Sequence, residues 1–321
     1  MKIRRMIAGI LITAMSTIVL AGCSTKDEVF KIGVNQFITH DALDASYQGF
    51  VDALAEAGYI DGENIKIDLQ NAQGDQATAS TIATKLINDN NDLILAIATP
   101  SAQAVANATK DIPILVTAVT DPAGSGLVAS NEAPEGNVSG TSDLTPIKSQ
   151  IELLMKLVPD AKNIAILYCS SESNSKIQAE MAAEAATEVG LTTVDATVSN
   201  SNEIQQVVQS LVGKVDAIYA PTDNIIAAGM PTVALVANDN GIPIICGESG
   251  MVDNGGFATN GIDYYKLGWM TGEQAVKIIK GEAKTETMPI EYLPEDQFTI
   301  KINDEVATKL GITIPAELQS K

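Results

Sequence analysis

The stretch Asp92-Leu93-Ile94-Leu95-Ala96-Ile97-Ala98 decides the fold, because after Asp92 it is a strand with no polar face. Strands of antiparallel sheets often alternate apolar and polar residues, whereas strands of parallel sheets are buried on both faces and are apolar throughout. A helical segment, 102–109, follows it, and a strand that begins at Pro113 comes next. This order of strand, helix and strand predicts a parallel sheet covered by helices.

The same order of segments occurs twice along the chain. Asp216-Ala217-Ile218-Tyr219-Ala220 repeats the pattern of residues 92–96, and Gly241-Ile242-Pro243-Ile244 repeats that of Asp111-Ile112-Pro113-Ile114. Short β-branched runs alternate with Ala-rich helical segments in both halves. The sequence therefore predicts an α/β protein with two doubly wound parallel-sheet lobes, a division that suits 321 residues better than one core does.

Residues 1–22 have the features of an export signal. Basic residues at positions 2, 4 and 5 precede an apolar run, 6–20, that is short for a transmembrane helix. The run ends in Leu20-Ala21-Gly22-Cys23, which resembles the lipobox of bacterial lipoproteins. That resemblance implies cleavage before Cys23 and lipidation of its thiol, so that 23–29 tether the protein to the extracytoplasmic face of the cell membrane. The alternatives are an uncleaved anchor helix or an ordinary buried cysteine.

Composition and motifs disfavour several classes of function. The chain has 20 basic and 40 acidic residues, and this net charge of −20 disfavours a nucleic-acid partner. A single histidine, His40, disfavours hydrolase sites and metal clusters that need this residue type. We therefore expect no catalytic activity, no metal and no cofactor. Cys169 and Cys246 each end an apolar run, so they are expected as buried thiols, with a disulfide as the alternative.

The residues directly after each predicted strand are the candidates for a binding site, because ligands of doubly wound sheets lie beyond the carboxyl ends of the strands. Two lobes placed face to face would enclose a ligand between two such edges. The selected residues are mostly hydroxyl-bearing or acidic: Gln36, Phe37, Thr99, Ser101, Asp121, Asp143, Glu172, Ser175, Thr222, Asp223, Asn224, Glu248 and Ser249. They include neither Arg nor Lys, which favours a ligand with an ammonium over a phosphate or dicarboxylate. Thr99, Asp121 and Asp223 are equally consistent with plain helix N-caps.

Several motifs resemble the ABC-transporter substrate-binding family whose members bind tryptophan, tyrosine or phenylalanine. They are Gln36-Phe37-Ile38-Thr39-His40, Thr99-Pro100-Ser101-Ala102, Val119-Thr120-Asp121-Pro122, Gly140-Thr141-Ser142-Asp143, Pro221-Thr222-Asp223-Asn224 and Gly261-Ile262-Asp263-Tyr264-Tyr265-Lys266-Leu267-Gly268. The resemblance covers essentially the whole mature chain. It implies the fold of type I periplasmic binding proteins, with 30–144 and 264–288 in a first lobe and 145–263 and 289–321 in a second.

The resemblance also implies a monomeric receptor that captures an L-amino acid, aromatic by family, and delivers it to an ABC permease. We expect the ligand carboxylate to meet Thr99, Ser101 and the amides of the following helix, and its ammonium to meet some of Asp143, Asp223 and Glu248. Phe37 would flank the ligand side chain, with Gln36, Glu172 and Ser175 at the edges. The alternatives are a sensory lipoprotein of the same fold that binds a solute such as a nucleoside or sugar, and an enzyme that pairs Asp143 with Asp223.

Overall fold

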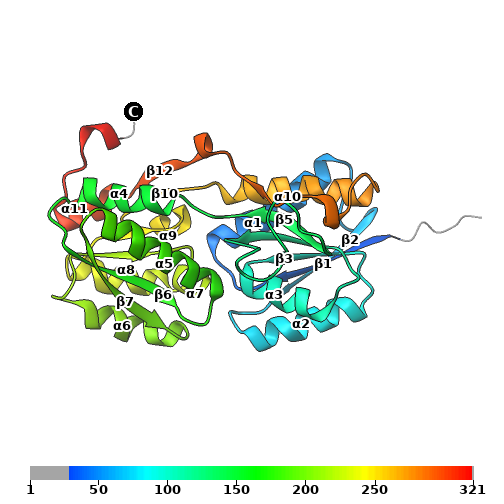
Figure 1. Cartoon of the computed structure of the whole chain (residues 1–321), viewed down its shortest axis with the longest axis horizontal. Coiled ribbons are helices and arrows are strands. Elements are labelled where there is room, and N and C mark those ends of the chain that lie inside the picture. The colour runs from blue at the N-terminus through cyan, green and yellow to red at the C-terminus, as the bar shows by residue number, and fades with distance from the viewer. Residues whose placement is uncertain (1–28, 320–321) are drawn as a thin grey trace, which may run out of the picture.

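Two lobes, each built on a six-stranded sheet, lie side by side in a computed structural model that describes residues 29–319 (Figure 1). The sheet orders are β2-β1-β3-β4-β5-β11 and β7-β6-β8-β9-β10-β12, so the second lobe repeats the strand order of the first. This arrangement confirms the predicted class of two α/β lobes. The expected signal peptide, Cys23 and the tether up to residue 28 lie outside the described residues.

The first lobe has a parallel sheet between two layers of helices. Its strands are β1 (Phe30–Gln36), β2 (Ile65–Asn71), β3 (Leu93–Ile97), β4 (Ile114–Val119), β5 (Val138–Ser142) and β11 (Glu291–Tyr292). Its helices are α1 (Asp41–Glu56), α2 (Gln76–Asn88), α3 (Thr99–Ala108) and α10 (Tyr264–Ile279). Every residue of β3 and β4 is buried, as an apolar strand covered on both faces requires.

Helices α1 and α10 pack unusually close together, although α10 follows the whole second sheet in the sequence (Figure 1). Glycines make this approach possible. A Cβ added at Gly49 would lie 2.0 Å from the Tyr265 carbonyl oxygen, and one added at Gly268 would lie 1.9 Å from the Ser46 carbonyl oxygen. The close packing holds the start of α10, and therefore Tyr264, in a fixed position against the first lobe.

The second lobe repeats this plan, with one antiparallel strand at its edge. Its strands are β6 (Asn163–Cys169), β7 (Thr192–Val198), β8 (Ala217–Ala220), β9 (Ile244–Cys246), β10 (Ala258–Gly261) and β12 (Thr299–Ile302), of which β12 runs antiparallel to β10. Its helices are α4 (Ile147–Leu157), α5 (Ser173–Glu188), α6 (Ile204–Leu211), α7 (Asn224–Ala228), α8 (Met230–Asp239), α9 (Ser249–Asp253) and α11 (Asp304–Leu310). Cys169 and Cys246 are buried free thiols.

The chain crosses between the lobes after β5, after β10 and after β11. We expected the third crossing at residue 289, but β11 still pairs with β5 of the first sheet, through Glu291 with Thr141 and Tyr292 with Ser142. The chain reaches the second sheet only at β12. Among the described residues, no helix is both long and apolar enough to cross a membrane.

Candidate functional site

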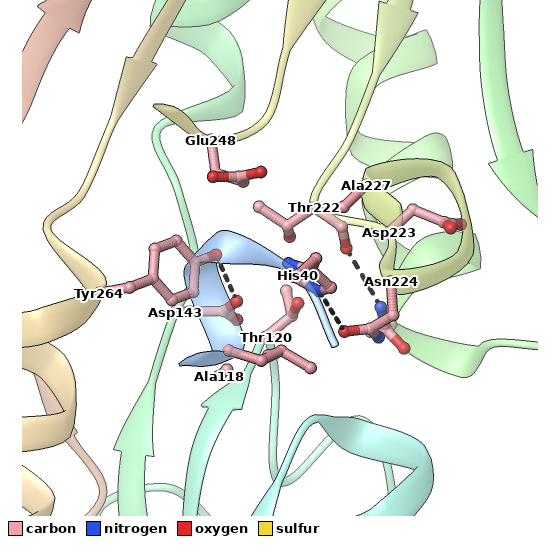
Figure 2. A pocket seen from close by; sticks show the side chains of 12 residues that line it. His40, Ala118, Thr120, Asp143, Thr222, Asp223, Asn224, Ala227, Glu248 and Tyr264 are labelled. Carbon is pink, nitrogen blue, oxygen red and sulfur yellow. Dashed lines mark hydrogen bonds between the residues drawn. The ribbon is translucent and has the colours of Figure 1, made fainter. Parts of the chain in front are cut away.

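A small cavity lies between the lobes, where the carboxyl ends of the two sets of parallel strands meet (Figure 2). Its empty space is about 280 Å³. The first lobe lines it with His40, Leu43, Ala118, Thr120, Asp143 and Tyr264, and the second with Asn174, Thr222, Asp223, Asn224, Ala227 and Glu248. Because both lobes contribute to the wall, the cavity depends on how the lobes close.

A distorted end of β4 places two polar residues of the first lobe at the cavity. Ala118 has a φ of 54°, and the register between β4 and β5 shifts between Val116 and Val119. The left-handed conformation is costly for a residue with a side chain, and such strain gathers at functional sites. Beyond the distortion, the Asp143 amide donates to the Val119 carbonyl oxygen at 3.2 Å, which fixes Asp143 after β5.

Tyr264 begins helix α10 and points at Asp143 (Figure 2). The side chain of Asp263 caps this helix by accepting from the Lys266 amide at 3.2 Å. The Tyr264 hydroxyl donates to Asp143 Oδ2 at 2.7 Å. One oxygen of the Asp143 carboxylate is thereby held in place.

Asp223 and Glu248 of the second lobe accept hydrogen bonds from backbone amides with both of their oxygens. Asp223 Oδ1 accepts from an amide in the first turn of α7 at 2.8 Å, and its Oδ2 accepts from the Cys169 amide at 2.5 Å. Glu248 caps α9, with Oε1 and Oε2 accepting from two amides of its first turn at 2.8 Å and 2.5 Å. The sequence left Asp223 open as a helix N-cap, a ligand-binding residue or both. The structure contains the N-cap hydrogen bond.

Glu172 precedes α5 but its carboxyl group reaches across to α7. It accepts from the Asn224 side-chain amide and, at 3.3 Å, from the Ile225 backbone amide. Asn224 in turn places its Oδ1 3.4 Å from His40 Nε2 of the first lobe. A chain of polar contacts therefore runs from the second lobe across the cleft to the first (Figure 2).

Three buried carboxyl groups, of Asp143, Asp223 and Glu248, line the cavity, and a fourth, of Glu172, lies behind its wall; among residues 29–319 no Lys or Arg lines it. Burial raises the pKa of Asp143 to about 6, of Glu248 to about 7 and of Glu172 to about 8. Burial also raises the pKa of Asp223, whose charge adds to the rise at Glu172. A positive group placed here would favour the ionised carboxylates, so the cavity suits a ligand that brings its own cation.

His40 does not supply that cation. It lies on the loop between β1 and α1, and burial lowers its pKa to about 4. The imidazole is therefore neutral at neutral pH. Among residues 29–319, no group of three His, Cys, Asp or Glu side chains is placed to hold a metal ion.

The structure brings part of the predicted set to the cavity. Asp143, Thr222, Asp223, Asn224 and Glu248 line it. Glu172 is hydrogen-bonded to Asn224, and Ser175 to Asn174, so both lie directly behind the wall.

The other predicted residues lie away from the cavity wall: Gln36, Phe37, Thr99, Ser101, Asp121 and Ser249. Phe37 is 1% exposed and packs in the hydrophobic core. Gln36 donates to Asp44, and Ser101 donates to Asn35, at 2.6 and 3.0 Å. Asp121 accepts from Asn131, and Ser249 lines a separate groove beside Tyr265. The expected carboxylate cradle at Thr99 and Ser101 is thus set back from the cavity.

The selected set of candidate residues left out His40, Thr120, Asn174 and Tyr264, which also line the cavity, although the family motifs contain three of them. Thr120 directly follows β4, and His40 and Tyr264 stand within a few residues of the ends of β1 and β10. The rule that ligands lie beyond strand ends could have found them. It could not say which residue of each loop points inward.

Two α/β lobes, joined by three crossings around a cavity with polar walls, define a two-lobed solute-binding protein. Comparison with known proteins agrees: a family model described as ABC transporter substrate binding protein matches residues 31–321. The chain belongs to this family. Its solved neighbours have the type I periplasmic binding protein fold, as the sequence resemblance implied.

Several relatives are similar over most of their length. The tyrosine-binding protein of Clostridioides difficile is 46% identical over 320 residues, which cover 95% of this chain and 91% of that protein. A Streptococcus pneumonia protein solved in complex with L-Trp is 43% identical, with a TM-score of 0.87 over 90% of this chain and 97% of that one. A ligand-free, open substrate-binding protein with adhesive properties from Clostridium difficile is 49% identical over the same shares, with a TM-score of 0.68.

Proposed function

We propose that this protein is the extracytoplasmic receptor of an ABC transporter, and that it captures an aromatic L-amino acid between its lobes and delivers it to a permease. The observation that carries the ligand class is the buried acidic wall. Asp143, Asp223 and Glu248 line the cavity and Glu172 lies behind it, all four at most 4% exposed, and no Lys or Arg within residues 29–319 lines the cavity beside them. A sugar or nucleoside would leave this excess of acid unrelieved, whereas the ammonium of an amino acid relieves it.

Similarity supports the aromatic side chain. The relatives named above include a tyrosine-binding protein and a protein solved with L-Trp. The cavity between the lobes also has an apolar part to its wall. Leu43, Ala118 and Ala227 supply its apolar lining.

Capture would proceed by closure of the lobes. The structure matches the L-Trp complex with a TM-score of 0.87. It matches the open, ligand-free relative with a TM-score of only 0.68, although the sequence of that relative is more similar to this chain. Closely related chains thus differ in the arrangement of their lobes. A ligand that contacts both lobes favours the closed arrangement by its greater affinity for it.

The direct test is to denature the purified protein and identify the released compound by mass spectrometry. Calorimetry with L-tyrosine, L-tryptophan and L-phenylalanine would then measure affinity, with the D-enantiomers and a nucleoside as controls. We expect an aromatic L-amino acid to bind and to be recovered unchanged. Binding of a sugar or nucleoside alone would overturn the ligand class, and chemical conversion of the ligand would overturn the receptor assignment.

The protein is further proposed to be a monomer held at the membrane by a lipid on Cys23. The lipid anchor rests on the sequence Leu20-Ala21-Gly22-Cys23. Changing Cys23→Ala should release the protein from the membrane fraction, whereas Cys169→Ala should not, because that buried thiol is not part of the lipobox sequence. Retention of the Cys23→Ala protein would count against the anchor.

A further inference from the structure

One buried hydrogen bond joins the two lobes behind the cavity. Gln178 of α5, in the second lobe, donates from Nε2 to the hydroxyl oxygen of Thr120, in the first lobe, at 3.0 Å. Both side chains are buried. Thr120 lines the cavity, whereas Gln178 does not. Gln178 therefore contacts the wall of the site from outside, across the boundary between the lobes.

Contacts within the second lobe fix the orientation of the Gln178 amide. Its Oε1 accepts from the Thr222 backbone amide at 3.2 Å and from the Thr222 hydroxyl at 2.7 Å. A backbone N–H can only donate, so these contacts assign the oxygen end of the Gln178 side chain. Nε2 also donates to the Thr222 carbonyl oxygen at 3.1 Å and, at 3.5 Å, to that of Asn174. All of these partners belong to the second lobe, so that lobe alone aims the donor at Thr120.

The first lobe holds Thr120 in place on the other side. Thr120 directly follows β4, beyond the distortion at Ala118, and its carbonyl oxygen accepts from the Ser142 hydroxyl at 2.7 Å. Ser142 is the last residue of β5, before the first crossing between the lobes. The Thr120 hydroxyl is therefore a fixed acceptor opposite a fixed donor.

The hydrogen bond exists only while the lobes are together at this point, because its two atoms belong to different lobes. In the closed arrangement both groups are out of water, so removal of either partner leaves the other buried and unpaired, which is costly. When the lobes separate, water can replace the lost contact. The pair of Gln178 and Thr120 therefore stabilises the closed arrangement relative to the open one.

Other hydrogen bonds between the lobes lie in wetter surroundings. Gln76 donates to the Ser171 carbonyl oxygen and Asn254 to Asp41, both at exposed positions. Water competes with such contacts, whereas a hydrogen bond in a low-dielectric interior is stronger and its loss more costly. We therefore expect the buried contact of Gln178 to contribute more to closure than these exposed ones.

We propose that Gln178 is a positioning residue for ligand capture: a latch that engages Thr120 as the lobes close, and that raises the affinity of the receptor without contacting the ligand. This rests on the proposed function, in which the closed lobes hold the ligand. The apparent affinity of a ligand scales with the population of the arrangement that binds it. A latch outside the cavity changes that population, so it should change the affinity for every ligand by the same factor.

The test is a double-mutant cycle of Gln178→Leu and Thr120→Val, with calorimetry on L-tyrosine, L-tryptophan and L-phenylalanine. Gln178→Leu should weaken binding about tenfold for each ligand that the wild type binds, and should preserve their relative affinities. In the Thr120→Val background the same change should weaken binding much less, because the partner is already absent. The contacts of Gln178 with Thr222 are lost in both backgrounds and cancel in the comparison.

Gln150→Leu is the matched control. Gln150 of α4 is an equally buried glutamine of the second lobe, but its partners all belong to that lobe: the carbonyl oxygens of Gly247 and Asn260, and the Tyr219 hydroxyl. Gln150→Leu should lower the unfolding temperature as Gln178→Leu does. Its effect on affinity should be the same with Thr120 and with Val at position 120, because it has no partner in the first lobe.

Two readouts decide the proposal separately from the proposed function. If the losses of affinity from Gln178→Leu and Thr120→Val simply add, the latch is overturned although the receptor assignment stands. If the wild type binds none of the three amino acids, the proposed function fails, and small-angle scattering of the ligand-free proteins then decides the latch. Gln178→Leu and Thr120→Val should each be more extended than the wild type, and curves identical to the wild type would overturn the latch. Thr120→Val changes little in volume, so it provides this reading even if Gln178→Leu does not fold.

Discussion

The hydroxyl of Tyr264 donates a 2.7 Å hydrogen bond to Asp143 and thereby links two of the three crossings between the lobes. Asp143 stands where the chain leaves β5 for the second lobe, and Tyr264 stands where it returns from β10 to α10. Both side chains also line the cavity (Figure 2). A change in the charge of Asp143 would therefore act at a crossing between the lobes and at the cavity together.

Tyr264→Phe should weaken binding of the amino acid about tenfold, since it removes the Tyr264 donor of Asp143 Oδ2. Calorimetry at pH 7 measures the effect. Tyr265→Phe is the matched control, because the neighbouring hydroxyl donates to half-buried Asp52 outside the cavity. Equal losses of affinity in the two variants would show that a change in helix α10, and not the loss of the hydrogen bond to Asp143, weakens binding.

Affinity should depend on pH through Asp143. Burial raises the pKa of Asp143 to about 6, so its carboxylate is largely protonated at pH 5 and ionised at pH 7. Only the ionised form attracts an ammonium, and affinity should rise about tenfold between these pH values. In Asp143→Asn this rise should disappear, and an unchanged slope would place the titrating group elsewhere.

The stability of the ligand-free protein should fall as pH rises from 6.5 to 8. The folded-state pKa values of Glu248 and Glu172 are raised to about 7 and about 8, so the folded protein binds protons that the unfolded chain has already lost. The stability that this protonation contributes is fully present at low pH and is lost as the pH rises through this window. The free energy of unfolding should fall by about 1–2 kcal/mol. His40, with its pKa lowered to about 4, acts in the opposite direction but mainly below pH 6.5.

Urea denaturation across this pH range checks the sign. Glu172→Gln should flatten the curve, because an amide has no proton to lose. A free energy of unfolding that rises from pH 6.5 to 8 in the wild type would contradict the expected protonation of these acids.

Gly268→Ala should destabilise the first lobe by about 1–3 kcal/mol or more, because overpacking displaces well-packed elements. The added Cβ would lie 1.9 Å from the Ser46 carbonyl oxygen. Gly136→Ala is the control, since its nearest neighbour would be 3.9 Å away. Thermal unfolding compares the two, and a stable Gly268→Ala protein would mean that α10 can move away from α1 at little cost.

Two hydrogen bonds at the rim should favour the closed lobes. Gln76 of α2 donates to the Ser171 carbonyl oxygen at 2.9 Å, and Gln103 of α3 donates to the Ser173 hydroxyl at 3.2 Å. Changing both glutamines to Ala should shift the ligand-free protein toward a more extended shape in small-angle scattering. The same change at exposed Gln205 and Gln209 of α6 should leave the scattering as it is. Identical curves for both pairs would mean that the rim bonds do not control closure.

The sequence was sufficient to predict the two lobes, because apolar strands such as Leu93–Ile97 and Ala217–Ala220 can only be buried in a covered parallel sheet. It was not sufficient for β11. Glu291-Tyr292 is a two-residue strand with an exposed tyrosine, and it pairs with β5 because of where the chain passes after α10. No local pattern encodes that route.

The candidate site was predicted in part for a similar reason. Asp223 and Glu248 follow strands directly, so the strand-end rule brought them to the cavity. Phe37 also follows a strand but turns into the core, whereas His40, three residues further on, faces the second lobe. The direction of a loop side chain is set by contacts between the lobes, and those contacts join residues that are remote in sequence.

The packing of α10 on α1 also sets the order in which the chain can fold. Synthesis releases residues 41–56 early, but the helix that covers them is residues 264–279, so the first lobe stays incomplete until most of the chain exists. Contacts between such distant segments also form slowly. For a protein that we propose to be exported, this delay is useful, because a chain that cannot finish its first lobe early remains open enough to be threaded through a membrane.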